Sequence, residues 1–116
     1  MSKLLFIYNA NSGIGNLVLD VAHKLFRPET YDCNLCAITH NTFSENKTWK
    51  AFRKNSNMDM VFLHTDEFKA QYPNTNFKYP IILQQSHNTL SPFLTTDAIN
   101  KLKSVEDLIA CIKIKL

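Results

Sequence analysis

Glycine is nearly absent from this sequence of 116 residues, which has only two glycines, Gly13 and Gly15. Both lie in one short loop, so a glycine-dependent turn is expected at only one place in the chain. A nucleotide-binding P-loop needs the run Gly-x-x-x-x-Gly-Lys-Ser/Thr, and no such run is present. The sequence therefore gives no motif for a P-loop nucleotidase.

Long apolar runs are also absent. No run approaches the roughly 20 apolar residues that a membrane-spanning helix needs. The N-terminus lacks the apolar segment and small-residue cleavage site of a signal peptide. The hydrophobic share of 45% and the charged share of 20% are ordinary for a globular protein. We therefore expect one domain, residues 1–116, in the cytoplasm and without a membrane partner.

Cysteine is scarce too, but two of the three cysteines, Cys33 and Cys36, form a Cys-x-x-Cys pair. In a reducing cytosol such a pair is more often redox-active or metal-binding than a structural disulfide. A redox dithiol needs one sulfur that ionises readily and a second that resolves the mixed disulfide. The leading hypothesis is accordingly a thiol-dependent redox or thiol-handling protein with Cys33 and Cys36 as catalytic residues and no cofactor. The third cysteine, Cys111, is predicted to belong to the core.

Two other interpretations of the pair stay open. In a metal-binding module, Cys33 and Cys36 supply two thiolates to zinc or iron and a histidine such as His23 completes the site, with His40 and His64 as further candidates. A structural zinc site normally has four ligands, however, and the sequence has no second Cys-x-x-Cys pair. The remaining interpretation is plain packing, because free cysteine is among the most buried residue types.

Hydrophobic periodicity predicts alternating strands and helices. An apolar run at residues 3–8 is typical of a buried strand. A β-rich stretch containing the two cysteines, residues 30–39, predicts a second strand. Ser104 and Asp107 form a capping-box-like pair before a closing helix. The other predicted elements are helices at 17–26 and 45–54, a strand at 58–64, a helical turn to 72, and strands at 81–83 and 93–96.

This order resembles the thioredoxin fold across essentially the whole chain. Tyr79-Pro80 before the strand 81–83 looks like that fold's strand opened by a cis-proline. The resemblance implies an α/β fold: a single thioredoxin-like domain whose central mixed sheet of about five strands is flanked by helices. The last strand is expected at an edge, because Pro92 cannot donate a ladder hydrogen bond.

The cysteine pair departs from the thioredoxin pattern. In that family the pair follows the second strand, where the next helix begins, and in this chain that place falls in residues 40–46. Cys33 and Cys36 would instead lie before or inside the second strand. Extended residues would point the two side chains to opposite faces, so the redox hypothesis requires a turn at Asn34 and Leu35.

A second candidate site is the loop that holds both glycines. Backbone N–H groups between a strand and a helix can bind a phosphate. The loop resembles the Asn-Pro-x-Ser-Gly-x-Gly loop of diacylglycerol-kinase-like proteins, with Ala10 in place of the proline and without the downstream Gly-Gly-Asp-Gly motif. A tight turn with a helix cap explains the same residues. The candidate ligand-binding residues are Asn9, Asn11, Ser12, Gly13 and Gly15, and the Ser12–Asn16 segment would serve a non-catalytic phosphate-binding or interaction domain.

His64 and Asp66 form a third candidate, at the carboxyl end of a predicted parallel strand, where open α/β sheets bind ligands. His64 can act as a base that Asp66 or Glu67 orients. The plainer alternative is a polar strand end whose two carboxylates favour the start of a helix. With Pro80, these residues complete the set of candidate ligand-binding residues.

The net charge of +3 gives little support to nucleic-acid binding. Several lysines and one arginine lie close in sequence to Trp49 and Phe52. A surface helix with those two rings packed inward explains these basic residues as well. Nucleic-acid binders usually have a larger basic surface. The expected partner is a thiol or disulfide, either on another protein or on a small molecule. The patterns Tyr8-Asn9-Ala10-x-Ser12-Gly13 and Thr30-Tyr31-x-Cys33-x-Leu35-Cys36 are similar to a small, largely uncharacterised bacterial family of about this length, a resemblance that implies a cytosolic bacterial protein and no particular activity.

Overall fold

The computed structural model describes residues 2–9, 33–40 and 45–115. Of the phosphate-loop candidates, Asn11, Ser12, Gly13 and Gly15 lie outside the described residues, as does His23. The described part contains four strands and five helices: β1 (Ser2–Tyr8), α2 (Asn34–Thr39), α3 (Lys47–Asn55), β2 (Asp59–His64), α4 (Thr65–Gln71), β3 (Ile81–Ser86), β4 (Thr89–Leu94), α5 (Thr96–Asn100) and α6 (Val105–Lys115).

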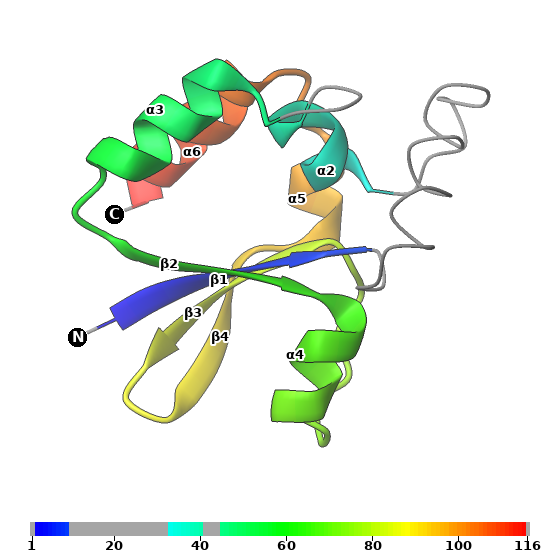
Figure 1. Cartoon of the computed structure of the whole chain (residues 1–116). Coiled ribbons are helices and arrows are strands. Elements are labelled where there is room, and N and C mark those ends of the chain that lie inside the picture. Colours follow the sequence, from blue (N-terminus) through cyan, green and yellow to red (C-terminus); the bar gives the residue numbers. More distant parts are fainter. Residues whose placement is uncertain (1, 10–32, 41–44, 116) are drawn as a thin grey trace.

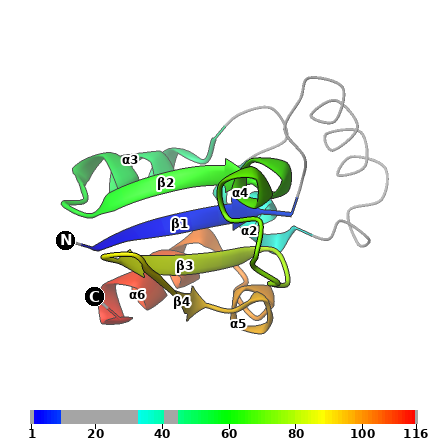
Figure 2. The ribbon, with the colours of Figure 1, turned by 90° about the horizontal axis from the view of Figure 1, so that it is seen from below.

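The strands form one mixed sheet in the order β2-β1-β3-β4 (Figure 2). β1 is parallel to β2, with Leu5 opposite Val61, and antiparallel to β3, with Leu5 opposite Leu83. β3 and β4 form an antiparallel hairpin. The continuous apolar run of β1 follows from this position, because a strand with neighbours on both sides and helices on both faces has no solvent-facing side. The predicted α/β class and the mixed sheet are confirmed.

Successive side chains of β1 enter two different cores, as the alternation of a strand requires. Leu4, Phe6 and Tyr8 face the layer made by α2, α3, α5 and α6, whereas Leu5 and Ile7 face the layer that contains α4 (Figure 1). The first core consists of Leu4, Phe6, Tyr8, Cys33, Leu35, Trp49, Ile82, Phe93, Leu94, Ile99, Val105, Leu108 and Ile112. The second consists of Leu5, Ile7, Leu63, Phe68, Ile81 and Leu83.

The strand predicted through the cysteine stretch is wrong, because Asn34–Thr39 form helix α2. The buried positions of this helix, Leu35 and Thr39, are four residues apart, which is the spacing of one helical face and not of a strand. The described residues therefore form a sheet of four strands, where about five were expected.

The other predicted elements that lie within the described residues are present with small changes of boundary, and the predicted helix at 17–26 lies outside those residues. Helix α3, strand β2 and helix α4 occupy the predicted segments, and Pro92 lies in an edge strand as expected. β4 ends at Leu94, earlier than predicted, because Thr95 caps a helix that was not predicted: its Oγ1 accepts a hydrogen bond from Ala98 N at 3.2 Å at the start of α5.

The cap of α6 has the predicted residues in a slightly different arrangement. Ser104 Oγ accepts a hydrogen bond from Asp107 N at 3.2 Å. The carboxylate of Asp107 accepts from Lys103 N at 3.0 Å, one residue before the position that a capping box uses. Both bonds satisfy backbone N–H groups at the helix start, so the sequence signal marked the correct boundary.

Candidate functional site

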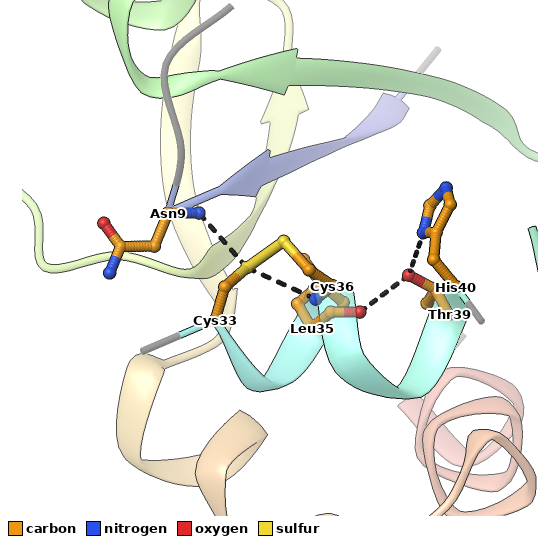
Figure 3. The surroundings of a disulfide bond; sticks show 6 residues. All are labelled: Asn9, Cys33, Leu35, Cys36, Thr39 and His40. Carbon is orange, nitrogen blue, oxygen red and sulfur yellow. Dashed lines mark hydrogen bonds between the residues drawn. A yellow bond between two sulfur atoms is a disulfide. The ribbon is translucent and has the colours of Figure 1, made fainter. Parts of the chain in front are cut away.

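The Cys-x-x-Cys pair occupies the first turn of α2. Cys33 is the N-cap residue and Cys36 lies one turn later, so the helix itself supplies the turn that the redox hypothesis requires. Their Cα atoms are 5.2 Å apart and their sulfur atoms are joined at disulfide distance (Figure 3). This separation is within the range that a disulfide spans without backbone movement.

The two sulfurs have different surroundings. Cys33 is 1% exposed and belongs to the core beneath the helices, whereas Cys36 is partly exposed at the edge of that core. Cys33 Sγ accepts two backbone hydrogen bonds, one from Cys36 N and one from Asn9 N, each at 3.3 Å (Figure 3). The second of these bonds connects the helix to the end of β1.

Asn34, between the two cysteines, anchors the motif to a distant part of the chain. Its side-chain amide donates to Ile99 O at 2.6 Å and to Leu102 O at 3.0 Å. Ile99 lies in the last turn of α5, and Leu102 lies just after the end of that helix. The Cys-x-x-Cys turn is therefore held from one side by β1 and from the other by α5.

A polar network runs from the sheet to the end of α2. Thr39, fully buried, donates from Oγ1 to Leu35 O at 2.6 Å and lies 2.9 Å from His40 Nδ1 (Figure 3). Tyr8 forms a side-chain hydrogen bond with the same threonine, and burial raises the pKa of its phenol well above the usual value. His40 lies against the Tyr8 ring, with 5.8 Å between the ring centroids.

The carboxyl end of β1 collects most of the described candidate residues. Tyr8 is paired with His64 on β2, and Ile7 is paired with Ile81, the residue after Pro80, on β3. Asn9 follows Tyr8 and binds Cys33 through its backbone N–H. The structure thus brings Asn9, His64, Pro80 and the cysteine pair to one edge of the sheet.

Glu67 is a carboxylate that His64 engages. Glu67 Oε1 lies 2.8 Å from His64 Nδ1 and accepts from His64 N at 2.8 Å. The hydrogen bond from the backbone N–H of His64 is the main reason that the pKa of Glu67 is lowered. Asp66 lies in the first turn of α4. The geometry matches the plainer interpretation of this segment, a carboxylate that satisfies the N-terminus of a helix.

No metal cluster forms among the described residues: within 2–9, 33–40 and 45–115, no three histidine, cysteine, aspartate or glutamate side chains are placed to hold an ion. The Nδ1 atom of His40 forms a hydrogen bond with Thr39 Oγ1. Cys111 is a free, partly buried cysteine on α6 that packs against the core, as predicted.

The basic residues around Trp49 surround a packed ring. Trp49 is fully buried and Phe52 is partly buried, as the surface-helix interpretation predicted. Arg53, from the same cluster, forms a bidentate ion pair with Glu45, with distances of 2.6 and 2.7 Å. This hydrogen bonding lowers the pKa of Glu45 and raises that of Arg53.

Two residues of this site had no clear sequence signal. Tyr8 reads as the last member of an apolar strand, and Thr39 as a β-branched residue in a predicted strand. Their connection depends on α2 crossing the end of β1, which only the tertiary structure shows. Among the described residues, no helix is long and apolar enough to cross a membrane.

Comparisons with family models, with curated proteins and with solved structures found no match to this chain.

Proposed function

We propose that this chain is a thioredoxin-like thiol–disulfide redox protein in which Cys33 and Cys36 alternate between a dithiol and a disulfide. One observation carries the proposal: the two sulfurs are at disulfide distance in the first turn of a helix. A pair in this position can bond and separate with little movement of the backbone, because its Cα atoms are already 5.2 Å apart.

The arrangement around the pair supports the thioredoxin-like part of the proposal. A parallel pair, β1 and β2, is connected through helices on one face, and the β3–β4 hairpin is followed by a helix. The peptide bond Tyr79-Pro80 is cis and directly precedes β3, as the resemblance implied. The cysteine pair begins a helix, as the family's pair does, although among the described residues it follows the first strand, β1, and not a second one.

The chemistry requires only the two thiols and a partner. One cysteine thiolate attacks a partner disulfide, forms a mixed disulfide and releases the partner's first thiolate. The other cysteine then attacks the mixed disulfide, and its electrons pass to the partner's second sulfur as the Cys33–Cys36 bond forms. The partner is a small thiol or a protein disulfide, the proposed setting is the reducing cytoplasm, and no cofactor takes part.

The test is catalysis of thiol–disulfide exchange between two small molecules. Reduction of hydroxyethyl disulfide by glutathione should accelerate in proportion to the added protein, and Cys111→Ala should behave as the unaltered chain does. The double variant Cys33→Ala/Cys36→Ala should leave only the uncatalysed rate. Equal rates with and without the pair would contradict the proposal. So would stoichiometric zinc or iron bound to Cys33 and Cys36 in the purified protein, which would favour the metal-binding alternative.

A further inference from the structure

The two cysteines are not equivalent, and the difference concerns both access and charge. Cys33 lies within the core at 1% exposure, while Cys36 is partly exposed. Two backbone N–H groups, those of Asn9 and Cys36, point at the sulfur of Cys33 (Figure 3). An external thiol that opens this disulfide attacks one of the two sulfurs and expels the other.

Access favours attack at Cys36. A thiolate must approach the attacked sulfur along the extension of the S–S bond, because the leaving sulfur departs on the opposite side. Approach to Cys33 would have to pass through the core that it shares with Leu35 and Ile99. Approach to Cys36 begins from the partly exposed side of α2.

Charge favours departure of Cys33. The sulfur that leaves carries the electron pair of the broken bond, and a better-stabilised thiolate leaves faster. Hydrogen bonds to an ionised group favour its charged form. Cys33 Sγ already accepts two such bonds, each at 3.3 Å, before any charge develops. No reorganisation of the backbone is needed to receive the charge.

We propose that Cys36 is the exchanging cysteine, which forms the mixed disulfide with a low-molecular-weight thiol, and that Cys33 is the buried leaving and resolving cysteine. This assignment rests on the proposed redox function and specifies which of the two cysteines reacts with the external thiol. In the reductive direction a small thiolate bonds to Cys36 Sγ, the Cys33–Cys36 bond breaks, and its electron pair goes to Cys33. A second small thiolate attacks the bound thiol's sulfur, which yields a small-molecule disulfide and frees Cys36.

The oxidative direction reverses these steps. The Cys36 thiolate attacks a small disulfide and expels one thiolate from it. Cys33 then attacks Cys36 Sγ and expels the second thiolate as the internal disulfide forms. The two protons that the Cys33 and Cys36 thiols lose are taken up by the two released thiolates, and the pair is oxidised to a disulfide as one small disulfide is reduced to two thiols.

The experiment uses glutathione as the probe and Cys111→Ala as the background. In this background, Cys33→Ala leaves only Cys36 and Cys36→Ala leaves only Cys33. Each reduced variant is mixed with oxidised glutathione and quenched in acid at intervals. Mass spectrometry then measures the fraction of protein that carries a glutathione adduct. We expect the chain with Cys36 to acquire glutathione at least about tenfold faster than the chain with Cys33, because thiol–disulfide exchange depends on access to the sulfur. A faster reaction at Cys33, or equal rates, would overturn the assignment.

A measurement on the intact pair guards against variants that fail to fold. The oxidised Cys111→Ala protein is treated briefly with reduced glutathione, quenched and alkylated, and its peptides are mapped. Glutathione on Cys36 together with the alkyl label on Cys33 is the expected result; the reverse labelling would overturn the assignment while leaving the redox function intact. A pair that neither opens nor re-forms in any glutathione mixture would overturn both.

Discussion

Tyr8 is the residue that connects the central strand to the helix that carries the cysteines. Its ring belongs to the core, and its hydroxyl forms a hydrogen bond with the buried Thr39. Thr39 in turn satisfies a carbonyl within α2 and lies against His40. Burial of this phenol has a consequence at high pH that can be measured.

Burial raises the pKa of Tyr8 in the folded state, whereas the unfolded chain ionises near pH 10. Above that pH the unfolded state loses a proton that the folded state keeps, so stability falls as pH rises. The expected slope approaches about 1.4 kcal/mol per pH unit for this one group. In Tyr8→Phe the part of the loss that Tyr8 causes should be absent, so the slope should become shallower, although losing the hydrogen bond to Thr39 should cost about 1 kcal/mol at neutral pH.

Urea unfolding of the oxidised Cys111→Ala protein between pH 8 and 11 checks this expectation without free thiols that titrate. Tyr79→Phe is the matched comparison, because burial raises the pKa of Tyr79 but that residue lies at a more exposed position. A slope in Tyr8→Phe as steep as that of the parent protein would show that another group causes the alkaline loss.

At the scale of the elements, α2 is the helix whose position decides the site. It has only six residues, too few for helical periodicity to appear in the sequence or for an isolated helix to be stable. Its stability comes from contacts with the rest of the fold, which include the two hydrogen bonds from Asn34 to the carbonyls of Ile99 and Leu102.

Asn34→Asp is expected to lower the free energy of unfolding by about 1–3 kcal/mol. The substitution keeps the shape of the side chain but removes both donated hydrogen bonds and places a negative oxygen beside two carbonyls. Asn57→Asp, at an exposed position after α3, is the control and should change stability by at most about 0.5 kcal/mol. Equal effects of the two substitutions in chemical denaturation would show that Asn34 does not anchor the motif.

The sequence predicted those elements whose signals are local. The apolar run of β1, the capping residues of α6 and the edge position of Pro92 each depend on neighbouring residues, and all three predictions are confirmed. Helix α2 was mistaken for a strand because its stabilising partners, Ile99 and Leu102, are 65 and 68 residues away. The difference between the two cysteines could not be predicted from the sequence either, because the amide that donates to Cys33 belongs to Asn9, 24 residues earlier.

At the scale of the whole molecule, one sheet separates two cores. Phe68 fills the core on the α4 side, in contact with the rings of Tyr72, Phe77 and Tyr79. Leu108 lies in the core on the opposite side, and both residues are fully buried. Strands β1 and β3 each contribute side chains to both cores. The two cores should therefore unfold together.

Phe68→Ala and Leu108→Ala are each expected to lower the stability of the same single unfolding transition, by about 3–5 and 2–5 kcal/mol respectively. Ile114→Ala is the control, because Ile114 is 82% exposed on α6 and its truncation should cost almost nothing. The transitions followed by far-ultraviolet circular dichroism and by the fluorescence of Trp49 should coincide. Two separate transitions, each sensitive to one variant, would contradict a single cooperative domain.

The central claim, that Cys33 and Cys36 form a reversible redox couple, is tested most directly by counting thiols against potential. The Cys111→Ala protein is equilibrated in glutathione mixtures, quenched in acid and alkylated, and its metal content is determined on the same sample. We expect two thiols to disappear together without bound metal, with a tenfold change in the ratio of dithiol to disulfide for about every 30 mV. Thiols that stay reduced throughout, or that are protected by stoichiometric metal, would contradict the account.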